Sequence, residues 1–381
     1  MASKPRSIFE EVDTTVKQEI TTGGIDAKGR GARKGIRAWL FALFALVAVM
    51  IAVGGLTRLT DSGLSITEWA PVSGAMPPIS AEAWDLEFEK YRQIPEYQEQ
   101  NKGMTLSEFK FIYWWEWGHR QLGRFIGLVW FAGFIGFAVT RNIPTGWTPK
   151  LLFLGALGGL QGFIGWWMVS SGLEEGMLDV ASYRLATHLG LAFVIFGFIA
   201  WYILQLSRRE ADLLQARRLG NPKLATWGSI LVAVTFVQIL LGALVAGIDA
   251  GRAFPQWPLM AGGFFPPDPF TIEPLWRNFF EDAGLVQFMH RMAGYVLFGL
   301  GIYVWMQARK SANAQTRFGF NMVLAMMVLQ MLLGIVTVVY SAPWQIAIVH
   351  QFGAVVLWVL VLRARFLASY PLPQSVRGET A

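Results

Sequence analysis

The sequence predicts an all-α integral membrane protein of eight transmembrane helices, built as two four-helix bundles related by a pseudo-twofold axis. Three observations support this fold class. Of the 381 residues, 54% are hydrophobic and only 15% are charged, against about 25% charged in ordinary soluble domains. Eight stretches reach the roughly 20 apolar residues that a membrane-spanning helix needs. The two halves of the chain also carry the same landmark residues in the same order, which indicates an internal repeat.

Each apolar stretch is longer than a typical strand and lacks period-2 alternation, so a helix is the expected spanning element. The eight stretches cover approximately residues 37–59, 113–140, 149–170, 183–206, 226–247, 285–307, 317–339 and 344–366.

The segments between these helices divide the chain into two bundles with polar ends. We expect a cytoplasmic N-terminal tail at 1–36, a first bundle at 37–206, a basic cytoplasmic linker at 207–225, a second bundle at 226–366 and a cytoplasmic tail at 367–381.

Two features of the ends and loops refine this division. The N-terminal tail shows no apolar signal-peptide core, and glycines at Gly23-Gly24 and Gly29 interrupt it, so we expect it to be uncleaved and flexible. Long outer loops are expected at 60–112 and 248–284. Proline and glycine in the first of these, between Leu64 and Pro78, predict an ordered irregular segment there.

The net charge of +6 reflects membrane insertion. With residue 1 placed inside, 21 of the 32 Lys and Arg residues fall on the inner side, which leaves 11 for the outer side. The positive-inside rule then places both termini on the cytoplasmic side of the membrane, which we expect to be a bacterial inner membrane. The same distribution argues against a nucleic-acid partner. The absence of cysteine excludes disulfides, covalently attached haem, iron–sulfur clusters and thiolate-bound haem.

The repeat relates helices 1–4 to helices 5–8. Near the outer end of the first helix of each unit, Gly54, Asp61, Gly63 and Trp69 recur as Gly242, Asp249, Gly251 and Trp257 at a constant offset of 188. The later helices repeat a His-Arg pair, a glutamine with a glycine, and a second histidine. Because four helices return the chain to the same side, the axis should lie along the membrane normal.

The four histidines are the candidate metal ligands. His119 and His188 lie on different helices of the first bundle, and His290 and His350 lie on different helices of the second. A single histidine in a membrane often only joins two helices by a hydrogen bond. Four that are paired by the repeat and level in depth match two axial haem ligands in each bundle. A zinc or copper site would usually need further ligands.

Two further groups of residues suit a haem. Arginines at the outer helix ends can pair with anionic propionates, although some of them could instead extend to the interface. These are Arg58, Arg120, Arg184, Arg252 and Arg291. Glycines repeat through the third helix and either bring helices together or leave a slot for the macrocycle. These are Gly155, Gly158, Gly159, Gly162 and Gly165.

One asymmetry separates the halves. Glu116 precedes His119 by three residues, so both project from one helix face, whereas Gln287 occupies the matching place before His290. A carboxylate inside a membrane is costly and usually functional, and it can transfer protons. The alternative is that Glu116 orients a ligand or pairs with Arg120. We therefore expect a reactive first bundle and a second bundle that holds haem or relays electrons.

At these residues the sequence resembles the haem A synthase family across 37–366. The resemblance is carried by the segment from Gly54 to Ser65 (Gly-Gly-Leu-Thr-Arg-Leu-Thr-Asp-Ser-Gly-Leu-Ser), by Glu116 with His119-Arg120, and by Thr187-His188, His290-Arg291 and His350. Some bacterial members carry a cysteine pair in the first outer loop. This chain lacks the pair and resembles the mitochondrial and alphaproteobacterial branch, so no role of those cysteines transfers to it.

The resemblance implies a function and a set of roles. It implies oxidation of a haem O methyl group to a formyl group, which gives haem A for cytochrome oxidase. It assigns a haem B cofactor to His290 and His350. Of the arginines at the outer helix ends, we expect Arg58, Arg120 and Arg291 to bind the haems. It assigns substrate haem O to His119 and His188, with Glu116 needed for turnover. Because all four histidines lie in the outer part of their helices, we expect both sites toward the outer side.

The partners implied are haem O with the synthase that makes it, an electron donor that the sequence does not identify, and membrane lipid. A homo-oligomer is compatible with the sequence. Two other functions remain open at this point. One is a dihaem b-type electron-transfer subunit linked to quinol, and the other is a haem chaperone or transporter.

Overall fold

The structure is a computed structural model that describes residues 24–374 of the chain. Eight helices in this range are long and apolar enough to cross a membrane, and no strand longer than an isolated bridge occurs among the described residues. The spanning helices are α1 (Gly24–Leu59), α4 (Leu106–Val139), α5 (Thr148–Gly172), α6 (Ser182–Leu206), α8 (Pro222–Gly247), α11 (Ala283–Arg309), α12 (Ala314–Val339) and α13 (Trp344–Ser369). The predicted fold class is confirmed.

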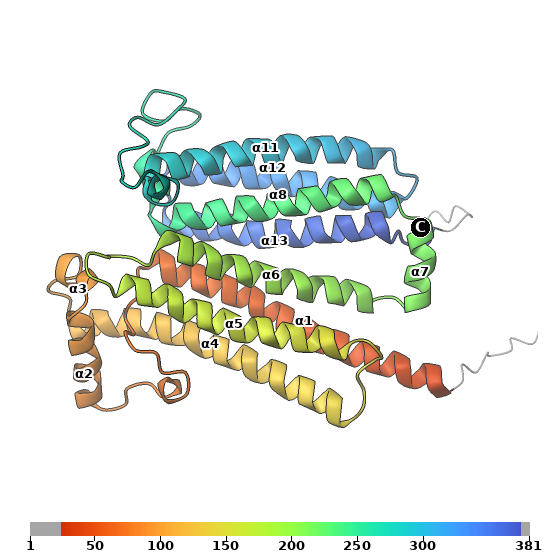
Figure 1. The fold of residues 1–381 in the computed structure, drawn as a ribbon, viewed down its shortest axis with the longest axis horizontal. Coiled ribbons are helices and arrows are strands. Elements are labelled where there is room, and N and C mark those ends of the chain that lie inside the picture. The colour runs from red at the N-terminus through yellow and green to blue at the C-terminus, as the bar shows by residue number, and fades with distance from the viewer. Residues whose placement is uncertain (1–23, 375–381) are drawn as a thin grey trace, which may run out of the picture.

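The helices form two bundles that lie side by side (Figure 1). Helices α1, α4, α5 and α6 make the first bundle, and α8, α11, α12 and α13 make the second. The bundles meet where α6 packs on α8 and α13, and where α1 packs on α13. Trp358 of α13 donates a hydrogen bond of 3.1 Å from its indole nitrogen to the carbonyl of Phe193 on α6. The arrangement is consistent with the predicted pseudo-twofold relation.

Polar caps mark where several spanning helices begin. Thr105 and Glu108 form a reciprocal capping box at the start of α4, while Asn221, Asp282 and Asn313 accept from backbone N–H groups at the starts of α8, α11 and α12. Such caps satisfy donors that the first turn of a helix leaves unpaired. They therefore fix the helix ends more sharply than the apolar pattern does.

Two predicted helix starts were wrong. Helix α1 begins at Gly24 and not at residue 37, because a glycine lowers helix propensity by only about 1 kcal/mol and good helix formers such as Ala27, Lys28 and Ala32 stand between the glycines. The predicted flexible tail 1–36 thus overlaps α1, and its residues 1–23 lie outside the described range. Helix α4 begins at Leu106 and not at residue 113.

The connecting segments contain helices that were not predicted. The loop 60–112 is irregular up to residue 80, with one 3-10 turn at Ser73–Ala75, and then forms α2 (Ala81–Arg92) and α3 (Pro95–Glu99). The linker 207–225 contains α7 (Glu210–Arg218). The loop 248–284 contains three short helical segments, which are α9 (Ala250–Ala253), η2 (Leu275–Arg277) and α10 (Asn278–Glu281).

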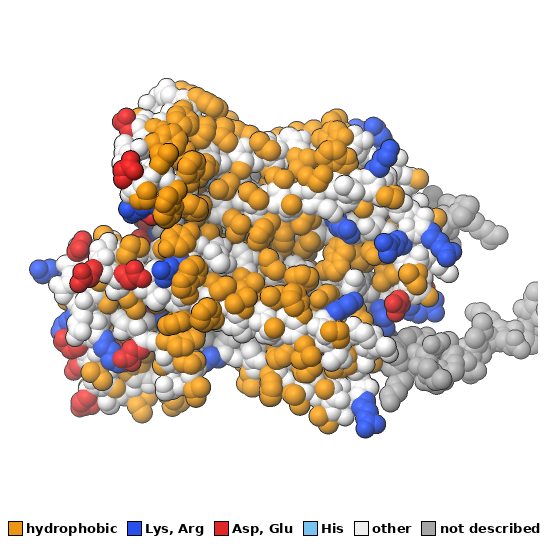
Figure 2. All heavy atoms as spheres, viewed as in Figure 1, with side chains coloured by type: hydrophobic (Ala, Val, Ile, Leu, Met, Phe, Trp, Pro, Cys, Tyr) orange, Lys and Arg blue, Asp and Glu red, His pale blue; other side chains and the backbone are white. Residues whose placement is uncertain are grey.

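The surface agrees with a membrane position. On the face shown in Figure 2, apolar side chains cover the middle of the molecule, basic residues gather at the end that carries α7, and acidic residues gather at the opposite end. An exposed apolar belt between two charged ends is expected of a chain whose middle contacts lipid.

Candidate haem site

One cavity connects the interiors of both bundles. Its volume is about 920 Å³, and His119, His188, His290 and His350 all line it. Single small-molecule sites commonly measure about 300–1,000 Å³, so the space suits a large ligand. The structure therefore brings all four predicted ligands to a shared interior.

Each histidine ring lies against a glycine on a neighbouring helix. A Cβ atom added to Gly54 would stand 2.8 Å from Cε1 of His119, and one added to Gly165 would stand 2.8 Å from Cε1 of His188. In the second bundle the distances are 3.1 Å from Gly242 to His290 and 3.2 Å from Gly334 to His350.

These four contacts pair residues that the repeat also pairs. Gly54 corresponds to Gly242, and Gly165 corresponds to Gly334. Any larger side chain at these positions would meet an imidazole at less than ordinary contact distance. The glycines thus set how close each histidine can lie to the neighbouring helix.

Glutamines support three of the histidine segments. The amide nitrogen of Gln161 donates to the carbonyl of His188 at 3.0 Å and lies 3.2 Å from its Nδ1. Gln238 contacts His290 in the same way, at 3.0 Å and 3.1 Å. Gln330 donates to the carbonyl of His350 at 3.0 Å. Sequence reasoning matched Gln161 to Gln330 as landmarks but gave them no role, and it missed Gln238, whose repeat counterpart is Met50.

The donor set fits haem. Nδ1 of His119 and Nδ1 of His350 are buried and have no hydrogen-bond partner among the described residues, which is unusual for buried polar atoms. A neutral imidazole that faces a largely apolar cavity can offer a ring nitrogen lone pair to iron, and all four histidines line this cavity. The residues present therefore fit two haem groups, with two histidines for each.

Glu116 is held by four donors. One oxygen, Oε2, accepts from the hydroxyl of Ser65 at 2.7 Å and from the backbone N–H of Ile66 at 2.8 Å. The other, Oε1, accepts from Nη2 of Arg120 at 2.5 Å and from its Nε at 3.1 Å. The side chain is only 3% exposed and lines the cavity beside His119. The carboxylate therefore ties α4 to the irregular loop 60–80.

Gln287 occupies the matching place in the second bundle with a complementary partner. Its Oε1 accepts from Arg291 at 2.7 Å, as Glu116 accepts from Arg120. Its amide nitrogen instead donates to the carbonyl of Ala250 at 2.7 Å. The second bundle thus offers a carbonyl acceptor where the first offers two donors, so each side chain matches its own loop.

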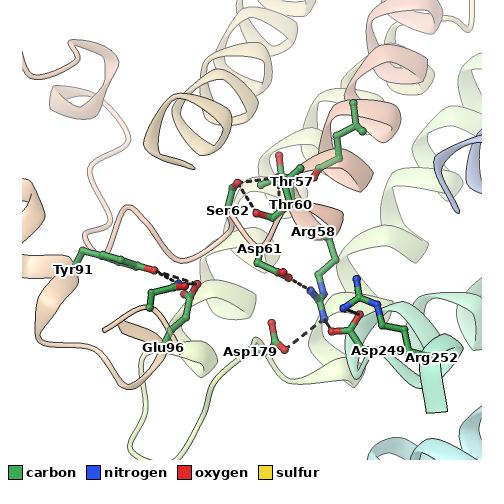
Figure 3. A network of polar contacts seen from close by, with 12 residues as sticks. Thr57, Arg58, Thr60, Asp61, Ser62, Tyr91, Glu96, Asp179, Asp249 and Arg252 are labelled. Atoms are coloured by element: carbon green, nitrogen blue, oxygen red, sulfur yellow. Dashed lines mark hydrogen bonds and ion pairs between the residues drawn. The ribbon is translucent and has the colours of Figure 1, made fainter. Parts of the chain in front are cut away.

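Arg58 and its partners close the outer rim between the bundles (Figure 3). Its guanidinium lies 2.7 Å from Asp61, 3.5 Å from Asp179 and 3.1 Å from Asp249 of the second bundle. Asp61 and Asp249 are repeat-related, and both adopt a left-handed backbone conformation with φ of 48° and 51°, which aspartate tolerates better than most residues. Burial raises the pKa of Asp179, while the nearby Arg58 lowers it.

The other predicted arginines differ in their access to the cavity. Arg120, Arg252 and Arg291 line it, whereas Arg184 does not and stacks over Trp167 at 4.8 Å. Sequence reasoning missed Arg124, which lines the cavity and donates to the carbonyls of Pro71 and Ala70. Its position one turn after Arg120 was the available signal.

Glu96, on the unpredicted α3, also reaches the cavity. It is 4% exposed, and its Oε1 accepts from the Tyr91 hydroxyl at 3.3 Å, while Oε2 has no partner among the described residues (Figure 3). Burial raises the pKa of Glu96 to about 8. A carboxyl that is largely neutral near pH 7 therefore stands at the outer rim of the first half.

Comparison with known proteins gives one consistent result. A family model described as a cytochrome oxidase assembly protein, COX15-CtaA, matches residues 37–362. A Heme A synthase from Dinoroseobacter shibae is 65% identical over 100% of both chains. One from a Ruegeria species is 64% identical over 98% of this chain and 99% of its own. One from Cereibacter sphaeroides is 58% identical over 100% of both.

Proposed function

We propose that this chain, which belongs to the COX15-CtaA family of cytochrome oxidase assembly proteins, is a haem A synthase that converts haem O to haem A. Full-length identity of 58–65% to proteins of that name supports the activity. The observation that carries it within the structure is the cavity itself. It holds two pairs of histidines, and only the pair of the first bundle has a carboxylate on the same helix face.

We assign the two pairs to different haems. His290 and His350 hold a haem B cofactor, which supplies one-electron transfer when bound, and His119 and His188 hold the substrate. The second bundle offers no ionisable side chain equivalent to Glu116, because Gln287 stands there. The oxidation of a methyl group to a formyl group involves proton transfers, and a carboxylate beside the substrate can hold or pass the protons. The same asymmetry favours an enzyme over a dihaem electron carrier.

Arginines at the outer rim are the partners proposed for the propionates. Nη1 of Arg124 is a buried N–H group without an acceptor among the described residues, and this side chain lines the cavity. Nε of Arg58 also lacks an acceptor among them and its side chain lines the cavity, but the rest of its guanidinium pairs with three aspartates, so Arg124 is the stronger partner. An unpaired guanidinium N–H favours an anion strongly. Arg120 and Arg291 contribute charge, although their N–H groups already bind Glu116 and Gln287.

We place the protein in the bacterial inner membrane with both termini in the cytoplasm and both haem sites toward the outer side. The charge distribution of Figure 2 supports this orientation. A reporter fused after residue 381 should be cytoplasmic, and one inserted near Asn101 should be external. An external C-terminus would contradict the orientation. The proposed partners are the haem O synthase that supplies substrate, a separate electron donor and lipid.

The activity is tested by the pigments that cells accumulate. Haems extracted from cells that express this chain should contain haem A only when a haem O source is also expressed. Cells that carry the His119→Ala variant serve as the control and should accumulate haem O. Absence of haem A with both genes present, in cells that supply oxygen and retain the protein in the membrane, would contradict the proposal.

A further inference from the structure

The cavity reaches deeper into the first bundle than into the second. Toward the cytoplasmic end it is lined by Leu43, Trp130, Leu154 and Ile199 of the first bundle. The repeat counterparts of these residues are Leu231, Gly301, Val323 and Val361, and none of them lines it. On α1 of the first bundle, the innermost residue that lines the cavity is Leu43. On α8 of the second bundle it is Thr235, whose repeat counterpart is Val47, so the lining ends four residues earlier there. Four residues correspond to about 6 Å of helix.

Three pairs of repeat-related residues account for the difference in depth between the two halves of the cavity. Gly127, Gly158 and Gly162 line the cavity in the first bundle, and their counterparts in the second are Phe298, Met327 and Met331, which line it there. No atom lies within 4 Å of a Cβ added to any of the three glycines. The space that the second bundle fills with a phenyl ring and two thioether chains is therefore open in the first.

The floor of each half shows how the space is filled or kept. In the second bundle, Met327 is 4% exposed and packs so tightly on Gly301 that a Cβ there would stand 2.4 Å from its Cε. In the first bundle a tryptophan, Trp130, replaces that glycine. Its ring lies against Gly155 of α5, where a Cβ would stand 2.1 Å from Cζ2. Trp130 thus forms a wall of the deep region and does not plug it.

We propose that this deep region, between α4 and α5 below the level of His119 and His188, binds the isoprenoid chain of haem O. The inference rests on the proposed function. Haem O carries a long isoprenoid chain on the edge opposite its propionates, where haem B carries a vinyl group. With the propionates at the outer rim, where Arg124 has a buried N–H group without an acceptor among the described residues, the opposite edge faces inward, toward Gly158 and Gly162.

Two observations outside the glycines support a ligand here. The lining of the deep region is apolar, through Leu43, Leu154 and Ile199, which suits a hydrocarbon chain. His119 and His188 line the same cavity above it, and Nδ1 of His119 is buried and has no partner among the described residues, so both imidazoles can hold the iron of the same ligand. The second bundle then excludes haem O by volume, because Phe298, Met327 and Met331 leave no room for a chain. The two halves select their haems by the space below the histidines.

The test copies the second bundle into the first. Purified full-length Gly158→Met and Gly162→Met variants are titrated with haem O and, separately, with haem B. The measured quantity is the affinity for the added haem that binds in addition to the haem already held by the second bundle. Overpacking typically costs about 1–3 kcal/mol, which is about 5- to 150-fold in affinity. We expect a loss of that size for haem O and no loss for haem B. Gly158→Ala, which adds one carbon, should lose less.

Gly136→Met is the matched control, because Gly136 is on α4, is exposed, has open space around an added Cβ and does not line the cavity. It should bind both haems as the wild type does. Retention of the second-bundle haem spectrum shows that each variant is folded. Unchanged haem O binding in both methionine variants, or equal loss of haem O and haem B, would overturn the inference. A wild-type protein that binds haem O but makes no haem A would instead contradict the proposed function.

Discussion

The two bundles use the same framework with different chemistry at one position. In both, an arginine one turn after the key side chain donates to it, through Arg120 to Glu116 and through Arg291 to Gln287. The loops differ, since Ser65 and Ile66 donate in the first bundle while the carbonyl of Ala250 accepts in the second. A carboxylate accepts only, whereas an amide needs one acceptor and one donor. The loop therefore determines which side chain can be buried there.

The outer loops that cover the two bundles also differ, and again the first bundle has the additional ionisable group. The first outer loop forms α2 and α3, and Trp84, Phe88 and Tyr91 of α2 pack with Phe109 of α4 in one buried cluster. That cluster brings Glu96 to the cavity. The second loop contributes only short helical turns, and no buried carboxyl among the described residues of 248–284 matches Glu96. Ionisable groups thus gather over the first half, where we place the reaction.

Loss of a second-bundle ligand should give the largest effect on bound haem. His290→Ala or His350→Ala removes one axial partner of the proposed resident haem, and most of the b-type absorption of the purified protein should disappear. His119→Ala and His188→Ala should leave that absorption largely in place. Spectra of detergent-purified protein, normalised to protein content, make the comparison. Loss of absorption from the first-bundle variants alone would reverse the assignment of the halves.

Glu116→Gln should abolish most turnover while leaving the second-bundle haem bound. It removes the charge that Arg120 pairs with, and a general acid–base group typically contributes 10²–10⁴-fold. The amide also turns an NH₂ group toward the N–H of Ile66 or toward Arg120, because the first loop lacks the carbonyl that Ala250 provides. Such a mismatch costs about 1–3 kcal/mol, so loosening of the loop is expected as well.

Ser65→Ala separates these two effects of the Glu116 variant. It removes one donor to Oε2 and keeps the carboxylate, so haem A formation should fall by about tenfold or less. Chromatography of extracted haems gives haem O, intermediates and haem A for both variants. Wild-type haem A in the Glu116→Gln strain would remove its catalytic role. Equal losses in the two variants would make Glu116 a residue that positions the loop.

Substitution of the glycines that face the histidines should give a graded effect. An alanine Cβ would stand 2.8 Å from His119 at Gly54 and 3.1 Å from His290 at Gly242. The closer contact should displace its ring more, so Gly54→Ala should lower haem A formation by about tenfold, within the usual cost of overpacking. Gly242→Ala should only shift the spectrum of the second haem. A larger effect from Gly242→Ala than from Gly54→Ala would contradict the view that the distance between the added Cβ and the imidazole determines the loss.

The smallest expected effect is on the pH dependence of the outer loop. The pKa of Glu96 is raised to about 8 from 4.5, so the folded loop keeps a proton that the unfolded loop releases between these values. Its contribution to stability is full below about pH 4.5 and is lost as pH rises through 8. Amides of α2 and α3, corrected for intrinsic exchange, should be less protected at pH 9 than at pH 6. Glu96→Gln should abolish that difference, and a pH effect that persists in the variant would assign it to another group.

Sequence reasoning predicted the features that depend on periodicity and spacing. Eight apolar stretches correspond to eight spanning helices, because lipid leaves backbone groups no partner outside the helix. The sequence predicted that the histidines lie at the same depth in the membrane, because the repeat gives them matching positions in their helices. The capping box at Thr105 and Glu108 was readable, and its use would have corrected the start of α4. The spacing of three residues from Glu116 to His119 predicted that both side chains project from one helix face, and both line the same cavity.

Only the tertiary structure decided which groups meet across helices and loops. The sequence could not show that Ser65 and Ile66 hold Glu116, that Arg58 joins Asp249 of the other bundle, or that Glu96 reaches the cavity. Gly158 and Met327 were readable as counterparts, but the open and filled spaces beside them were not. Spacing along a helix fixes the direction of a side chain, whereas the volume and the hydrogen-bond partners it meets depend on how separate segments pack.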